Sequence, residues 1–193
     1  RQGGDGRNDI AAAVHPDLRP ADEIGQAGRR KGEDMADNNI DKGGITPAAN
    51  VTSVLFACNI NAVRSAMAEA MIKARFPGRI FTDSCGVEPG GQDGFAIAVM
   101  EEAGIDLSSH QPKGFDDLDC EFYDVIISFS PEAHDRALEL TRNIDCQTLY
   151  WPVDNLAGLQ GSREERLRAY RAVRDDISAK LTAWLPQENE GEG

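Results

Sequence analysis

A cysteine, an arginine and a serine stand at a spacing that could support nucleophilic chemistry on an oxyanion. Cys58 ends an apolar run, and Arg64 and Ser65 follow after five intervening residues, where a helix-like pattern begins. A cysteine between a strand and a helix N-terminus lies where backbone N–H groups and the helix dipole attract anions, and this field favours the thiolate. The arginine offers a planar fork to a tetrahedral oxyanion, and the serine can donate to the sulfur. The spacing indicates a thiolate that attacks phosphorus, although a buried structural cysteine at a strand end is the alternative.

Alternating strand and helix patterns around this motif predict the scaffold that positions it. Strand-like runs occupy residues 51–57, 79–83, 123–129 and 147–151, and helical patterns occupy 64–76, 93–103, 131–140 and 163–184. Apolar residues that share one face of the last helix are Leu167, Tyr170, Val173, Ile177, Leu181 and Trp184. Strand–helix alternation is typical of a parallel sheet covered by helices on both sides. We therefore expect an α/β fold, a three-layer sandwich with a central four-stranded parallel sheet and a phosphate-binding loop after the first strand.

The two ends of the chain lack such patterns. Residues 1–50 are polar, rich in Gly, Asp and Arg, and show no sustained period, which predicts a disordered leader. Residues 186–193 are an acidic tail. The catalytic domain is therefore expected to span residues 51–185.

Composition limits the partners and cofactors that we expect. A net charge of -13 argues against binding to nucleic acid or to anionic membranes. No apolar run is long enough to span a membrane, and the start of the chain shows no signal-peptide pattern. Four cysteines without a C-x2-C pair, and three histidines, suit neither a disulfide framework nor a zinc site. We expect a monomeric cytoplasmic enzyme with a free thiol and with neither metal nor cofactor.

The chain resembles the low-molecular-weight protein tyrosine phosphatase family, whose superfamily includes the thioredoxin-coupled arsenate reductases. The resemblance runs from about residue 51 to residue 185. The residues that carry it are Cys58, Asn61, Arg64 and Ser65, together with segments 68–70, 83–87, 104–110, 123–127 and 151–154.

The resemblance implies a phosphatase that hydrolyses phosphomonoesters, either phosphotyrosine-type protein substrates or small molecules, through a cysteinyl-phosphate. Cys58 would be the nucleophile, and Asp154 would protonate the leaving group and then activate water. Asn61, Ser65, Ser84 and His110 would support the loop. The residues expected to bind phosphate are Asn59, Ile60, Asn61, Ala62, Val63, Arg64 and Ser65.

Two departures from the family pattern leave other functions open. Ile60 stands where the family has glycine, and a β-branched residue resists the positive φ that glycine permits. Asn155 stands where proline normally follows the catalytic aspartate. Because both changes loosen the expected geometry, a catalytically weak phospho-binding module is one alternative.

Arsenate reduction is the other alternative, and it requires a second thiol to resolve the first. Ser130 stands where those enzymes carry a cysteine after the third strand. The remaining candidates for a resolving thiol are Cys85, Cys120 and Cys146.

Two features have competing interpretations. Trp151 could stack on an aromatic leaving group beside Asp154, or it could pack in the core. The acidic segment with Asp116, Asp117 and Asp119 is more easily explained as a solvated turn than as a site.

Overall fold

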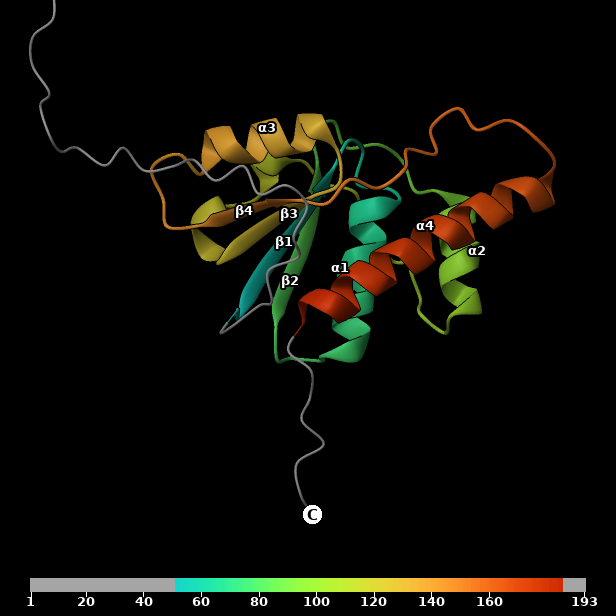
Figure 1. Ribbon diagram of the computed structural model, residues 1–193, viewed down its shortest axis with the longest axis horizontal. Coiled ribbons are helices and arrows are strands. Elements are labelled where there is room, and N and C mark those ends of the chain that lie inside the picture. The colour runs from blue at the N-terminus through green and yellow to red at the C-terminus, as the bar shows by residue number, and fades with distance from the viewer. Residues whose placement is uncertain (1–50, 186–193) are drawn as a thin grey trace, which may run out of the picture. The chain divides into compact units, whose positions relative to one another are not determined.

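The computed structural model describes residues 51–185, so the predicted leader and acidic tail lie outside the described residues (Figure 1). The strands are β1 (Ser53–Cys58), β2 (Phe81–Gly86), β3 (Val125–Ser128) and β4 (Gln147–Tyr150). The helices are α1 (Arg64–Arg75), α2 (Gly94–Glu102), α3 (Pro131–Leu140) and α4 (Arg163–Trp184), and two short 3-10 helices cover Phe115–Asp117 and Cys120–Phe122.

The four strands form one parallel sheet in the order β2-β1-β3-β4, which confirms the predicted α/β fold. β1 is central, and all six of its residues are buried, as expected for a parallel strand covered on both faces. The carboxyl ends of parallel strands meet at one edge of the sheet, where ligands bind in open α/β folds. Cys58, the last residue of β1, and Asp154, in the loop after β4, therefore lie at the same edge of the sheet.

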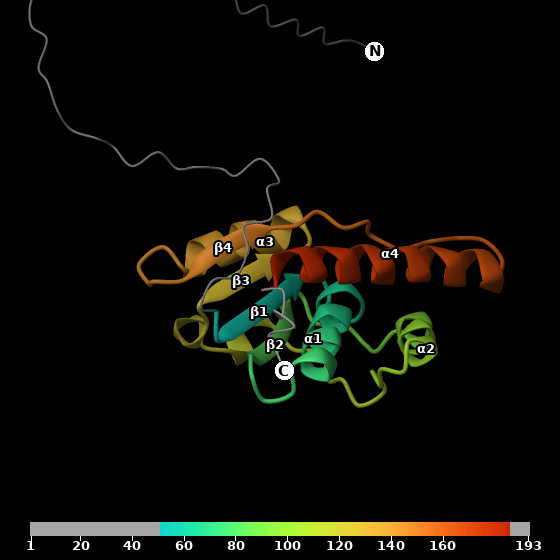
Figure 2. The ribbon, with the colours of Figure 1, turned by 60° about the horizontal axis from the view of Figure 1, so that its bottom comes forward.

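Helices cover both faces of the sheet (Figure 1). Val54, Phe56 and Cys58 of β1 pack in the cluster that contains the buried side chains of α1 and α4. Leu55 and Ala57 point to the opposite face and pack with the buried alanines of α3. Figure 2 shows α4 as a long helix running past α1 towards α2. Because side chains alternate between the two faces along β1, Cys58 lies on the face that α1 covers.

The ends of two helices follow from local side-chain chemistry. Ser162 and Glu165 form a capping box at the start of α4, and the six predicted apolar residues of that helix are all buried. The hydroxyl of Ser130 accepts from the N–H of Ala133, and Pro131 occupies the first turn of α3. α1 differs, because Val63 at its N-cap provides no capping side chain. The amino end of α1 is therefore open to an external acceptor.

The remaining elements differ from their predictions in detail. β2 runs three residues further than expected, to Gly86, because it pairs with the full length of β1. Asp116, Asp117 and Asp119 are exposed, as predicted, and two of them also order the 3-10 helices. The carboxylate of Asp117 accepts from the N–H of Gly114 at 2.8 Å, and that of Asp119 accepts from the N–H of Glu121 at 3.0 Å.

Trp151 belongs to the core. Its side chain is 5% exposed and packs edge-on against Trp184, with ring centroids 5.7 Å apart. The interpretation of Trp151 as a stacking platform for substrate is therefore wrong.

Candidate active site

The segment between β1 and α1 forms a loop around the Cys58 thiol. The Sγ of Cys58 lies 3.0 Å from the Oγ of Ser65, in the first turn of α1, and both residues are buried. Ser65 has a single hydroxyl proton, which it can direct to this sulfur or to the carbonyl oxygen of Cys85 at 3.2 Å. A thiolate at Cys58 would thus have a hydrogen-bond donor and the uncapped end of α1 beside it.

Asn61 fixes the conformation of the loop. It has a φ of 53° and is the one non-glycine residue with a positive φ among residues 51–185, so the strain expected at Ile60 does not arise. Asparagine tolerates this region better than most residues. The buried Asn61 amide donates to Ser84 Oγ at 2.7 Å and to Ser65 Oγ at 3.0 Å. Its Oδ1 accepts from the N–H of Lys113 at 2.9 Å, and its backbone oxygen lies 2.8 Å from His110 Nε2.

The segment that follows β2 holds the outer side of the loop. The N–H groups of Val87, Glu88 and Gly90 donate to the carbonyl oxygens of residues 58, 59 and 60 at 2.9–3.0 Å. Within residues 51–185, no N–H of residues 59–63 donates to another protein group. These N–H groups are therefore available to a bound oxyanion.

Gly86 allows β2 to approach the loop closely. A Cβ at this position would lie 2.8 Å from the backbone N of Asn61 and 2.8 Å from the backbone C of Ile60. Contacts of this length force the backbone to move. Sequence reasoning noted Gly86 only as part of a family segment, because a requirement for close approach is not visible in a single sequence.

Gly86→Ala is expected to destabilise the fold by about 1–3 kcal/mol, the usual cost of overpacking, and to lower turnover at least about tenfold by displacing the loop. Urea unfolding and steady-state kinetics measure the two effects. Gly91→Ala is the matched control, because a Cβ there meets nothing within 4 Å. Equal behaviour of the two variants would contradict this role for Gly86.

Arg64 closes the loop with a guanidinium that is largely held by the protein. Its Nη1 donates to the carbonyl oxygens of Phe129 at 3.0 Å and Val153 at 3.1 Å. Its Nη2 donates to Oδ1 of Asn59 at 2.6 Å. A guanidinium has five N–H donors. The Nε–H and one Nη2–H therefore remain for an oxyanion.

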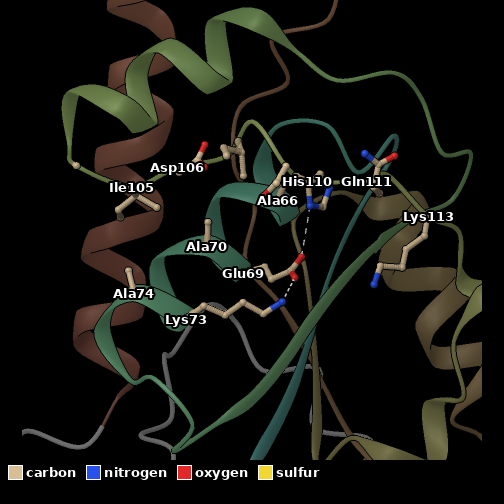
Figure 3. A pocket seen from close by; sticks show the side chains of 13 residues that line it. Ala66, Glu69, Ala70, Lys73, Ala74, Ile105, Asp106, His110, Gln111 and Lys113 are labelled. Atoms are coloured by element: carbon tan, nitrogen blue, oxygen red, sulfur yellow. Dashed lines mark hydrogen bonds and ion pairs between the residues drawn. The ribbon is translucent and has the colours of Figure 1, made fainter.

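A polar network lies behind the loop, in the wall of a cavity of about 540 Å³ (Figure 3). Glu69, on α1, is buried and accepts hydrogen bonds from Ser84 Oγ and from Lys73. The Nδ1 of His110 lies 3.7 Å from the Glu69 carboxylate. The structure thus brings the predicted supporting residues together and adds Glu69, which the sequence showed only as part of the family-like segment 68–70, with no role assigned to it.

The Cys58 thiol lines a small cavity of about 40 Å³, with room for about three water-sized groups. The residues that line it are Cys58, Ile60, Val63, Arg64, Asp93, Asn155, Leu156, Ala157 and Tyr170. Sequence reasoning did not predict Asp93 or Tyr170, whose hydroxyl donates to the Asp93 carboxylate at 2.7 Å.

Asp154 lines a neighbouring cleft of about 380 Å³ rather than this cavity. Arg64 and Asn155 line both, so the cleft lies beside the thiol site. Asp154 is exposed, and its carboxylate accepts no hydrogen bond from residues 51–185. The structure therefore places Asp154 near the predicted nucleophile, with Asn155 between the two spaces.

The other three cysteines lie on the far face of the sheet. Cys85 and Cys120 pack in the cluster that contains α3, and Cys146 packs against it, whereas Cys58 belongs to the opposite cluster. Burial raises the pKa of the Cys85 and Cys120 thiols, and it raises the pKa of Cys146 to about 11. These thiols are separated from Cys58 by the sheet and are poor sources of thiolate.

Sequence and structure comparisons place this fold and loop in a known group. A sequence model of the family "Low molecular weight phosphotyrosine protein phosphatase" matches residues 53–191. An arsenate reductase of Bacillus licheniformis is 28% identical over 129 residues, which cover 67% of this chain and 91% of that protein. The glutaredoxin arsenate reductase of Synechocystis sp. is 41% identical over 75 residues, so the match spans 39% of this chain and 57% of that relative's length.

Solved structures give the same fold. An arsenate reductase in its phosphate-binding state superposes with a TM-score of 0.58 at 29% identity, covering 68% of this chain and 95% of that one. The tyrosine phosphatase of Erwinia amylovora superposes with a TM-score of 0.59 at 22% identity, covering 70% and 92%. The fold and the cysteine–arginine loop define an enzyme class that works on oxyanions. The chain belongs to the low-molecular-weight phosphotyrosine protein phosphatase family, whose superfamily contains both phosphatases and arsenate reductases.

None of the helices in residues 51–185 is long and apolar enough to cross a membrane.

Proposed function

We propose that the protein is a phosphatase that hydrolyses phosphomonoesters, including phosphotyrosine-type protein substrates, through a phosphorylated Cys58. The observation that carries this proposal is the geometry of the loop. It combines a buried thiol beside an uncapped helix end, loop N–H groups without a protein acceptor in residues 51–185, and an arginine with two unused donors. Cys58, Ile60, Val63 and Arg64 line a cavity of about 40 Å³, a size suited to a phosphoryl group.

The proposed reaction has two in-line steps. The Cys58 thiolate attacks phosphorus, the S–P bond forms, and the bond to the leaving oxygen breaks as that oxygen takes a proton from Asp154. Water then attacks the cysteinyl-phosphate, Asp154 accepts its proton, and the thiolate leaves with release of phosphate. The loop N–H groups and Arg64 stabilise the equatorial oxygens in both steps.

Arsenate reduction is the second candidate, and it is favoured by the names of the curated relatives. In that reaction, the Cys58 thiolate forms a bond to the arsenic of arsenate as one hydroxyl of arsenate leaves as water. A second thiol then attacks the sulfur, and the S–As bond breaks with its electron pair going to arsenic, which leaves as arsenite. The result is a disulfide, which a further thiol reduces. Because the other cysteines lie across the sheet, the second thiol would come from a separate donor such as glutaredoxin or glutathione.

Turnover assays with a Cys58→Ser control separate these candidates. A phosphatase should release phosphate from p-nitrophenyl phosphate and from a phosphotyrosine peptide without added thiol, and Cys58→Ser should abolish this activity. Quenched reactions should contain a cysteinyl-phosphate, detected by its mass. Arsenite formation that requires glutaredoxin and glutathione, without phosphate release from either ester, would instead establish arsenate reduction.

A further inference from the structure

Asn59 connects the arginine of the loop to a carboxylate on another element. Arg64 Nη2 donates to Oδ1 of Asn59 at 2.6 Å, and Nδ2 of Asn59 donates to a carboxylate oxygen of Glu132 at 3.1 Å. Glu132 lies in the first turn of α3, 73 residues away in the chain from Asn59. All three residues line the cleft that also contains Asp154.

The chemistry of the two partners fixes the orientation of the Asn59 amide. An amide side chain has an accepting oxygen at one end and a donating nitrogen at the other, whereas an ionised carboxylate can only accept. Glu132 therefore requires Nδ2 on its side and leaves Oδ1 facing Arg64. Hydrogen bonds from its own backbone N–H and from Asn59 hold the pKa of Glu132 below its ordinary value, so it is ionised at neutral pH.

This orientation determines which donors of Arg64 are free. Oδ1 of Asn59 occupies one hydrogen of Nη2, and the carbonyl oxygens of Phe129 and Val153 occupy Nη1. With the Asn59 amide reversed, an NH2 group would face the guanidinium, and Arg64 would lose this acceptor. The guanidinium would then be held on one side only.

We propose that Glu132 is a positioning residue of the oxyanion site, acting through Asn59 to hold Arg64 with its Nε–H and one Nη2–H facing the ligand. The inference rests on the anion-binding role proposed for Arg64. For the removal of Glu132, it predicts weaker phosphate binding, whereas simple charge repulsion predicts tighter binding. A carboxylate close to an anion site should weaken anion binding, so its removal should strengthen binding unless the carboxylate has a positioning role.

Binding of inorganic phosphate, measured by isothermal titration calorimetry, tests this role without depending on turnover. Glu132→Ala is expected to raise the Kd of phosphate about three- to tenfold, the effect of losing one hydrogen bond in the chain. Glu132→Gln, which keeps an accepting oxygen, should lie between this variant and the natural protein. Glu139→Ala is the control, because Glu139 is a second exposed glutamate on α3 that pairs with Arg136 and does not line the cleft.

If Glu132 acts through Asn59, the effects of Glu132→Ala and Asn59→Ala on the Kd of phosphate should not be additive. In an Asn59→Ala background, the additional Glu132→Ala change should leave the Kd of phosphate unchanged or lower it. Unchanged or tighter phosphate binding by Glu132→Ala in the natural background would overturn the proposal, as would an equal loss in both backgrounds. If Glu132→Ala lowers the melting temperature, the same comparison is made with Glu132→Gln. If these effects on phosphate binding are observed but the protein has no phosphatase activity, the proposed function is wrong and the role of Glu132 stands.

Discussion

Replacing Arg64 by lysine is expected to lower kcat/KM for p-nitrophenyl phosphate about 10²–10³-fold, nearly as much as replacing it by alanine. The protein already uses three donors of this guanidinium, on the carbonyl oxygens of Phe129 and Val153 and on Asn59. Two further donors remain for the oxyanion. A lysine ammonium has three donors on one nitrogen and cannot make both sets of contacts.

The same contacts predict a cost in stability. Arg64 is 6% exposed, and its removal leaves two buried carbonyl oxygens without this donor. An unsatisfied buried group costs about 1–3 kcal/mol, so thermal unfolding is measured beside the kinetics. Arg75→Lys, on the exposed end of α1, is the matched control. A lysine variant with kcat/KM within tenfold of the natural protein would show that charge alone suffices and that the planar fork is not required.

The scaffold was predictable because its signals are local. The hydrophobic period of each strand and helix lies within that element, and strand–helix alternation is typical of a parallel sheet. The predicted bounds of the last helix, residues 163–184, agree with α4, because its apolar residues recur with helical spacing over the whole length. The length of β2 was not predicted, because it depends on pairing with β1 rather than on its own composition.

Only the site residues that lie close together in the sequence could be predicted. Cys58, Arg64 and Ser65 are close in sequence, and their relation survives in the structure. Gly86, Asp93 and Glu132 reach the loop from other elements through the order of the strands and the packing of the helices. Glu69 contacts Ser84 of β2 from α1, behind the loop. No spacing in the sequence encodes such contacts, so these residues were not assigned roles.

Ile60 shows why a departure from a family pattern needs a structure for its interpretation. The expected conflict assumed that the second residue after the cysteine takes a positive φ. That conformation is taken by Asn61, one residue later, and four hydrogen-bond partners of its side chain and backbone oxygen stabilise it. Asn155 is therefore the one remaining departure that favours a catalytically weak phospho-binding module.

Asp154→Asn is expected to lower turnover of phenyl phosphate about 10²–10⁴-fold, the usual contribution of a general acid. Phenoxide is a poor leaving group and requires the proton. The loss should be much smaller for 2,4-dinitrophenyl phosphate, whose leaving group departs unprotonated. Single-turnover experiments should also show slower hydrolysis of the phosphoenzyme, because the same carboxylate then serves as the base. Equal losses for the two esters would mean that Asp154 is not the acid.

Asn155→Asp is the companion variant, because Asn155 lines both the Cys58 cavity and the cleft, whereas Asp154 lines the cleft alone. If Asp154 is the acid, a second carboxylate beside the thiolate adds only repulsion of the phosphoryl dianion, and kcat/KM should fall for both esters. If the proton must come from the position of Asn155, the variant should gain turnover for phenyl phosphate and not for the dinitrophenyl ester. Such a gain, together with unchanged turnover in Asp154→Asn, would show that the natural protein lacks an effective general acid. This result would favour the weak phospho-binding module over the phosphatase.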